Sequence, residues 1–169
     1  EKFSRLLSPN LVDQVIDGKV EIAKGGETRE STVLFSDLRG FTAMSQRMGP
    51  TEIVQELNSY FEFMVDVVFE FGGTLDKFMG DGLMAVWGAP VSQDDAPLRA
   101  VKAALKMKHA LAEFNELRRS SGQEEMKMGI GIDTGHLVAG YMGSTKTMNY
   151  TVIGPPVNLA ARLCAIAAP

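Results

Sequence analysis

The fold of this chain is decided by two stretches, Thr32-Val-Leu-Phe-Ser-Asp37-Leu-Arg-Gly40-Phe-Thr42 and Lys77-Phe-Met-Gly80-Asp81-Gly-Leu-Met-Ala85. The first begins with a short run of apolar, β-branched and aromatic residues, which is typical of a buried strand. The second centres on a Gly-Asp-Gly turn between two strand-like segments, 74–78 and 83–87, which is typical of a β-hairpin. Each stretch therefore places one carboxylate where a strand meets a glycine-containing turn.

Helical and strand patterns alternate along the rest of the chain. Apolar residues at helical spacing predict a helix from Gly49-Pro50 to Gly72-Gly73 and a second helix that Asp94 or Asp95 caps. The apolar residues of the second helix are expected on one face: Val101, Leu105, Leu111, Phe114 and Leu117. Three more strands are predicted at 126–132, 136–142 and 148–153, and a third helix begins at Pro155-Pro156.

This order, β-α-β-β-α-β followed by a β-β-α extension, predicts an α+β fold. It matches the ferredoxin-like, palm-like arrangement, an antiparallel sheet with helices on one face. In this topology the first and third strands are antiparallel neighbours. Asp37 and Asp81 are therefore expected to lie side by side, although they are far apart in sequence.

The first thirty residues differ in character from the rest. Ser8-Pro9 predicts a short helix that ends at Gly18, and residues 18–30 are polar and glycine-rich. We expect residues 1–29 to be a connector helix and linker from an upstream regulatory region, and residues 30–169 to be the main domain. Because the chain starts without methionine and stops just after a helical pattern, we expect it to be a piece of a larger protein.

Composition restricts the class of protein. The chain has 169 residues, of which 45% are hydrophobic and 22% charged, as expected for one globular domain. A net charge of −4 without a basic stripe argues against nucleic-acid binding. A single cysteine, Cys164, excludes an internal disulfide and suits a reducing, cytoplasmic compartment. No signal peptide or membrane-spanning apolar run is visible.

Two adjacent carboxylates repel one another unless a cation lies between them. Magnesium prefers carboxylate oxygens together with phosphate oxygens, and two metals about 4 Å apart support an in-line displacement at phosphorus. Asp37 alone can also be read as an ordinary turn or N-cap residue, and Asp81 as a hairpin-turn residue. Their predicted adjacency favours a metal pair.

Other residues suit phosphate and base recognition. The turn Gly40-Phe41-Thr42 offers backbone N–H groups to phosphate oxygens. Lys77 is either an edge-strand lysine that discourages aggregation or a donor to a base or phosphate. Asn158 and Arg162 share one helix face. Arg162 is either an exposed or ion-paired residue, or a stabiliser of charge developing on phosphate, and Asn158 is an orienting residue.

Four phrases, in order, resemble the catalytic domain of the class III nucleotidyl cyclases. They are Leu34-Phe-Ser-Asp37-Leu-Arg-Gly-Phe-Thr42, Gly73-Thr-Leu-Asp-Lys77-Phe-Met-Gly-Asp81-Gly-Leu-Met-Ala85, Gly129-Ile-Gly-Ile-Asp-Thr-Gly135, and Tyr150-Thr151-Val-Ile-Gly154 with Val157-Asn158-Leu-Ala-Ala-Arg162. The resemblance implies conversion of a nucleoside triphosphate into its 3′,5′-cyclic monophosphate and pyrophosphate. It also implies that Asp37, Asp81 and the backbone carbonyl of Leu38 hold two Mg²⁺ or Mn²⁺ ions per active site, and that Gly40, Phe41 and Thr42 cradle phosphates.

The same resemblance assigns the base and ribose contacts. Lys77, Thr151 and the backbone of Val152 match the base-reading positions, Asn158 the ribose-orienting residue and Arg162 the stabiliser of the transition state. In this family the site forms between two subunits, so a homodimer carries two sites. A lysine donor suits a ring nitrogen of adenine, and a threonine hydroxyl can accept from the adenine amino group, so ATP is the expected substrate.

Threonine at position 151 resembles the bicarbonate-responsive subgroup, which implies bicarbonate as an activator. Two features depart from the family pattern: the family's domain continues past Pro169, where it usually carries a late lysine, and Pro155-Pro156 is unusual before the Asn/Arg helix. The alternative is a catalytically impaired cyclase-fold domain for dimerisation or nucleotide sensing. A diguanylate cyclase is disfavoured, because its Gly-Gly-Asp/Glu-Glu-Phe signature would stand where Met79-Gly-Asp-Gly82 does.

Overall fold

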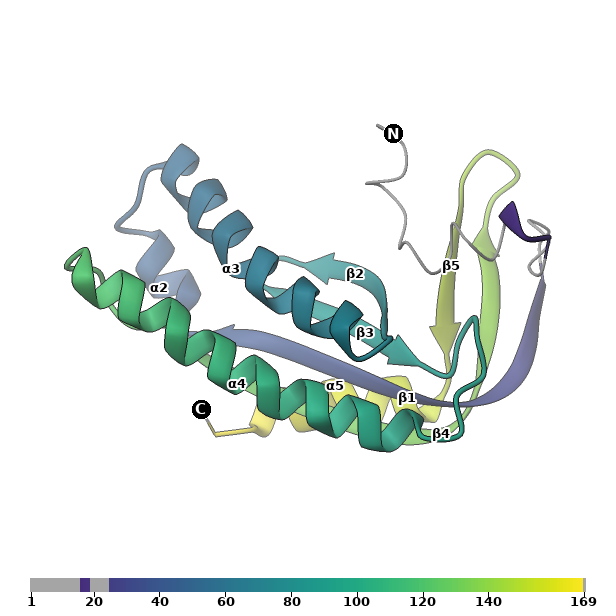
Figure 1. Ribbon diagram of the computed structural model, residues 1–169. Coiled ribbons are helices and arrows are strands. Elements are labelled where there is room, and N and C mark those ends of the chain that lie inside the picture. The colour runs from purple at the N-terminus through teal and green to yellow at the C-terminus, as the bar shows by residue number, and fades with distance from the viewer. Residues whose placement is uncertain (1–15, 19–24, 169) are drawn as a thin grey trace.

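The computed structural model describes residues 16–18 and 25–168. In chain order its elements are β1 (Gly25–Arg39), α2 (Phe41–Ser45), α3 (Pro50–Glu70), β2 (Thr74–Met79), β3 (Gly82–Trp87), α4 (Ala96–Ser120), β4 (Lys127–Gly143), β5 (Met148–Ile153) and α5 (Pro155–Ile166). The strands form one antiparallel sheet in the order β2-β3-β1-β4-β5 (Figure 1). The position of β1 between β3 and β4 confirms the predicted ferredoxin-like topology.

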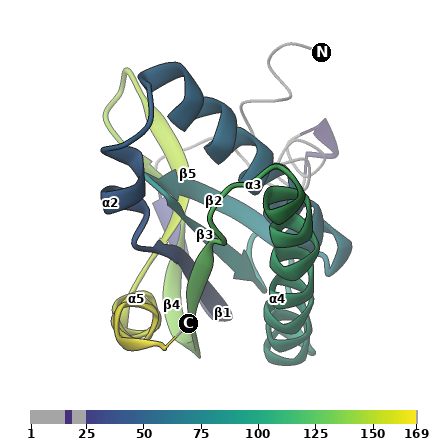
Figure 2. The same cartoon turned by 90° about the vertical axis from the view of Figure 1, so that its left-hand side faces the viewer.

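Helices cover both faces of the sheet. The long helices α3 and α4 pack on one face, where Leu34, Tyr60, Trp87 and Met107 are fully buried. On the opposite face, α5 packs through Ala160 against a second apolar cluster (Figure 2). The two helices of the βαββαβ unit thus share one face as predicted, and the helix of the extension covers the other. Among the described helices, none combines the length and apolar character needed to cross a lipid bilayer.

The first strand is much longer than the apolar run that predicts it. It starts at Gly25, so residues 25–30, expected to be linker, are part of the sheet. This segment is mostly exposed and pairs with residues 136–141 of β4. Backbone hydrogen bonds to β4, and not burial of its side chains, therefore hold it in the sheet. Most of the predicted connector helix before Gly18 lies outside the described residues.

Two further predictions were wrong in detail. The segments 126–132 and 136–142, expected as separate strands, are one continuous strand, because Gly135 pairs with Ser31 of β1 and does not interrupt the ladder. On α4, three residues expected to share one face with the buried Leu111 and Phe114 are about half exposed: Val101, Leu105 and Leu117. The buried face is instead built largely from alanines, such as Ala100 and Ala103, whose small side chains let the helix lie close to the sheet.

Close packing of α5 on the sheet depends on a glycine in β4. A β-carbon at Gly131 would collide with the backbone of Ala160 and Cys164. No side chain larger than hydrogen fits there unless α5 moves away from the sheet. The helix α5, which carries Asn158 and Arg162, can therefore pack this closely on the sheet only because Gly131 has no side chain.

We predict that Gly131→Ala lowers the free energy of unfolding by about 2 kcal/mol or more, because the added methyl group overpacks this contact. Urea unfolding followed by circular dichroism measures the change. Gly49→Ala is the matched control, since a β-carbon at Gly49 meets no atom within 4 Å. Equal stability of the Gly131→Ala variant and the control would contradict this account of how α5 is seated.

Candidate active site

The β1–β3 ladder brings the two predicted carboxylates together. Asp37 pairs directly with Gly82, the residue after Asp81. A β-carbon at Gly82 would lie 2.7 Å from the carbonyl oxygen of Ser36 and 3.2 Å from Oδ1 of Asp37, so glycine gives the Asp37 carboxylate its space. The predicted proximity of Asp37 and Asp81 is confirmed, and their role as metal ligands stays a prediction.

The electrostatics of this pair suit a cation. Partial burial raises the pKa of Asp81, and the negative charge of Asp37 raises that pKa further. Within the described part of the chain, no three His, Cys, Asp or Glu side chains gather into a metal-binding cluster. A divalent cation held here would complete its shell with backbone oxygens, water or phosphate, which is how magnesium binds beside nucleotides. The donor set therefore fits Mg²⁺ or Mn²⁺.

Arg39 is a residue of this region that sequence reasoning missed. Its guanidinium lies 3.4 Å from Oδ2 of Asp37 and donates hydrogen bonds to the backbone carbonyls of Cys164 and Ala167 at the end of α5. The side chain passes over Gly129, where a β-carbon would collide with it. Arg39 thus ties the strand end that carries Asp37 to the helix that carries Arg162. The structural sign is Gly129, which pairs with Asp37 in the ladder and leaves space for the Arg39 side chain; this sign becomes readable only once the strand register is known.

The turn after β1 leads directly into a short helix. Gly40 has a φ of 72°, in the left-handed region that glycine adopts readily, and it precedes the short helix α2, which was not predicted as a separate element. Phe41 is buried and anchors the turn, whereas Thr42 is exposed. The first N–H groups of a helical turn lack intrahelical partners. The turn can therefore offer backbone donors to an anion beside Asp37.

Lys77 and Thr151 come from strands at opposite edges of the sheet, yet one carboxylate joins them. Thr151 Oγ1 donates a hydrogen bond of 2.7 Å to Oδ2 of Asp76, and Nζ of Lys77 lies 3.4 Å from Oδ1 of the same residue. Asp76 is the second residue that sequence reasoning missed. An aspartate inside a predicted strand, directly before Lys77, was the available signal.

Bending of the sheet makes this contact possible. Through β4, Thr151 is level with Gly26 of β1, whereas Asp76 lies near the level of Leu34. Along a flat strand these levels would be about 26 Å apart. Figure 1 shows β1 and β4 curving away from the α3–α4 layer at the end where β5 pairs. The curve brings the inner part of β5 back toward β2.

Asn158 and Arg162 lie on the exposed surface of α5, one helical turn apart. Among the described residues, neither forms a hydrogen bond or ion pair with Asp37, Asp81, Lys77 or Thr151, and Arg162 has no carboxylate within ion-pair distance. Arg162, for which the simpler expectation was an exposed or ion-paired residue, is exposed, and no described carboxylate compensates its charge. That charge is available to an anionic ligand.

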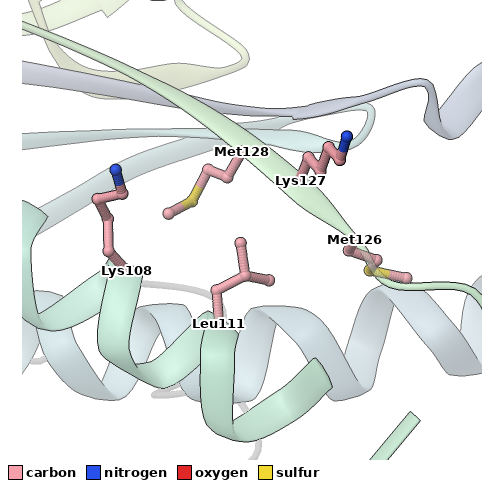
Figure 3. Close-up of a pocket in the computed structure, with 5 residues that line it drawn as sticks. All are labelled: Lys108, Leu111, Met126, Lys127 and Met128. Carbon is pink, nitrogen blue, oxygen red and sulfur yellow. The ribbon is translucent and has the colours of Figure 1, made fainter. Parts of the chain in front are cut away.

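A separate hollow of about 240 Å³ lies between α4 and the start of β4. Figure 3 shows Leu111 of α4 and Met128 of β4 facing one another across it, with the ammonium groups of Lys108 and Lys127 at its rim. None of the predicted site residues lines it. Met128 belongs to the α3–α4 core, whereas side chains alternate along β1 and place Asp37 on the other face of the sheet from Leu38. The hollow is therefore distinct from the carboxylate pair.

We predict that Asp37→Asn lowers the pKa of Asp81 toward its usual range in metal-free protein, because a neighbouring negative charge is removed. NMR titration of the Asp81 carboxyl carbon measures the shift. In the wild type the pKa of Asp81 is higher in the folded state than in the unfolded state. The free energy of unfolding therefore decreases as the pH rises from the unfolded-state pKa through the folded-state pKa. In the Asp37→Asn variant this decrease is expected to be smaller.

The matched internal control is Asp95, directly before α4, whose pKa is lowered by its hydrogen bond to Arg99. This pKa is expected to stay unchanged. An Asp81 pKa that does not move in the variant would show that the two carboxylates do not interact.

Known nucleotide cyclases are similar to this chain in sequence. The sequence profile of the adenylate and guanylate cyclase catalytic domain matches residues 24–169. Adenylate cyclase 1 of Rhizobium meliloti is 37% identical over 135 residues, covering 80% of this chain and 20% of the relative. Adenylate cyclase of Anabaena cylindrica is 36% identical over 166 residues, covering 96% of this chain and 31% of the relative. The chain thus spans between a fifth and a third of the length of these relatives.

Solved structures of both substrate types resemble the fold. The guanylyl cyclase Cya2 superimposes with a TM-score of 0.81 at 46% identity, covering 85% of this chain and 73% of that one. The adenylyl cyclase CyaB from P. aeruginosa gives a TM-score of 0.82 at 33% identity, covering 85% of this chain and 75% of that one. Together with the profile match, these similarities show that the chain belongs to the adenylate and guanylate cyclase catalytic domain family.

Proposed function

We propose that this domain is an adenylate cyclase that converts ATP into 3′,5′-cyclic AMP and pyrophosphate at the interface of a homodimer. The observation that carries the proposal is the adjacency of Asp37 and Asp81, placed by the β1–β3 register beside the Gly40 turn. Two acidic side chains next to exposed backbone donors suit a metal-bound triphosphate. The pairing of Lys77 with Thr151 through Asp76 supports a base site nearby.

The chemistry is an in-line displacement at the α-phosphorus. The ribose 3′-oxygen forms a bond to phosphorus, the bond to the β-phosphate oxygen breaks, pyrophosphate leaves, and the 3′-hydroxyl proton is released. Asp37, Asp81 and the backbone carbonyl of Leu38 would hold two Mg²⁺ or Mn²⁺ ions, which would supply charge neutralisation and activation of the hydroxyl. The Gly40-Phe41-Thr42 turn would bind phosphate oxygens through its backbone N–H groups.

The α5 residues would act on the reacting groups. Arg162, unpaired among the described residues, would stabilise negative charge that develops on the phosphate oxygens. Asn158, one turn earlier, would orient the ribose. Because neither residue is hydrogen-bonded to the carboxylates of its own chain, we place them opposite the metal pair of a second copy.

Exposed apolar residues support such an association. Phe78 and Met79 of β2, Ile153 of β5, and Leu159 and Leu163 of α5 are between 36% and 59% exposed. They lie on the same elements as the proposed nucleotide contacts. Large exposed apolar side chains beside functional residues are typical of an interface between subunits.

The family match leaves the base open, because similar structures include both adenylyl and guanylyl cyclases. The base-reading residues favour adenine. Lys77 is a hydrogen-bond donor, which suits a ring nitrogen acceptor, and the Thr151 oxygen can accept from the adenine amino group. Guanine presents a carbonyl oxygen at that position and suits these partners less well.

The proposals on regulation rest on the length of the relatives and on one residue, Thr151. Because the relatives are about three to four times as long as this chain, we propose that upstream regulatory segments in the same polypeptide control the domain. Bicarbonate activation rests on Thr151 alone and stays a prediction.

We predict that protein containing this domain, assayed with Mn²⁺, has a kcat/KM for ATP at least about tenfold above that for GTP, because a hydrogen-bonding site rejects a base with mismatched donors and acceptors. Chromatographic identification of cyclic AMP and cyclic GMP measures both reactions. A preference for GTP would overturn the assignment of Lys77 and Thr151. Nucleotide binding without either product would favour the alternative of a catalytically impaired domain.

We predict that an equal mixture of Asp37→Ala and Arg162→Ala proteins recovers about a quarter of the wild-type specific activity, because half of the randomly paired dimers keep one intact composite site. Each variant alone is expected to be nearly inactive. Mixing after dissociation, with heterodimers verified by native mass spectrometry, tests this. Heterodimers without recovered activity would contradict a site shared between subunits.

A further inference from the structure

Asp76 is a buried carboxylate next to the proposed base site. It lies on β2 where the pairing with β3 shifts register between Leu75 and Lys77. Its side chain is only 4% exposed, whereas the side chain of the following Lys77 is 49% exposed. The bulge re-aims the side chains of the strand, a usual effect of such irregularities. A carboxylate buried to this degree needs partners that compensate its lost hydration.

Its partners are the two residues proposed to read the base. Oδ2 of Asp76 accepts the hydroxyl hydrogen of Thr151 at 2.7 Å. Oδ1 lies 3.4 Å from the Lys77 ammonium, an ion-pair distance, but without hydrogen-bond alignment. Although burial raises the pKa of Asp76, its interactions with Thr151, Lys77 and the backbone of Val152 favour the ionised form.

The direction of the Thr151 hydrogen bond matters for recognition. A hydroxyl carries one hydrogen to donate and two lone pairs that accept. When its hydrogen is committed to Asp76, the Thr151 oxygen can only accept from a third group. An exocyclic amino group satisfies that acceptor, whereas a carbonyl oxygen at the same place faces a lone pair. A buried mismatch of this kind is costly, because a polar group is left without a partner.

We propose that Asp76 is a positioning residue that fixes the Thr151 hydroxyl as an acceptor and thereby selects adenine, which has an amino group at C6, over guanine, which has a carbonyl at C6. This role rests on the proposed cyclase function. It adds a residue that need not touch the nucleotide and acts through Thr151.

The test is Asp76→Asn, which keeps the size of the side chain but can donate its amide hydrogen to Thr151. The hydroxyl is then free to donate toward the base. We expect the ratio of kcat/KM for ATP to that for GTP to fall about tenfold, mainly through KM, while kcat for ATP changes little. Asp94→Asn, on an exposed loop residue, is the matched control and is expected to keep the wild-type ratio.

A double-variant cycle tests whether Asp76 changes the ATP/GTP ratio through the Thr151 hydroxyl. In a Thr151→Val background, Asp76→Asn is expected to leave the ratio unchanged, because no hydroxyl remains to orient. An unchanged ratio in the single Asp76→Asn variant, or an equal drop in both backgrounds, would overturn the proposal. Wild-type preference for GTP is a different result: it would refute the proposed substrate, and this inference with it.

A second variant covers the case in which Asp76→Asn does not fold, as judged by thermal unfolding. Thr151→Asn can donate its amide hydrogen to Asp76 and leave its carbonyl oxygen facing the base. With Asp76 as the orienting group, this variant keeps a preference for ATP, whereas Thr151→Val loses it. Loss of the preference in both variants would overturn the proposal.

Discussion

The antiparallel ladder between β1 and β3 is the constraint on which the rest of the structure depends. Six consecutive pairs, from Thr32 with Trp87 to Asp37 with Gly82, fix the register. Residues 31–36 of β1 are buried, so a shift by one residue would turn an apolar face toward the wrong layer. Burial of the strand therefore determines where its terminal carboxylate lies, and packing in the core sets the geometry of the acidic pair.

The proposed ribose, phosphate and base contacts on α5 and β5 are positioned by separate structural features. Gly131 allows α5 to lie against the sheet, and Arg39 ties the end of α5 to the strand that carries Asp37. Curvature of β1 and β4 brings Thr151 back to Asp76. These contacts connect three regions that are distant in sequence. A change that loosens α5 or the bend would disturb the proposed ribose and base contacts while leaving the carboxylate pair in place.

Much of this arrangement could be predicted from sequence, and the failures have physical causes. The strand-turn-strand signals around Asp37 and Asp81 are local, and the element order was enough to make them neighbours. The extension of β1 back to Gly25 was missed because residues 25–30 are mostly polar or glycine and show no alternation of apolar and polar residues. The buried face of α4 was misjudged because alanines, and not Leu105 or Leu117, face the sheet.

The missed site residues share a feature. Arg39 and Asp76 both act through contacts with residues more than seventy positions away, Cys164 and Thr151. Such contacts depend on strand register and sheet curvature, which no local pattern encodes. A charged residue within a strand was the only local signal, and it does not identify the partner.

The central claim is that Asp37 and Asp81 together hold a pair of cations under a triphosphate. Electron paramagnetic resonance of Mn²⁺ bound with a non-hydrolysable ATP analogue tests it most directly. We expect a spectrum of two magnetically coupled ions, about 4 Å apart, that is lost in both Asp37→Asn and Asp81→Asn variants. A single uncoupled ion in the wild type, or coupling that survives either substitution, would contradict the account.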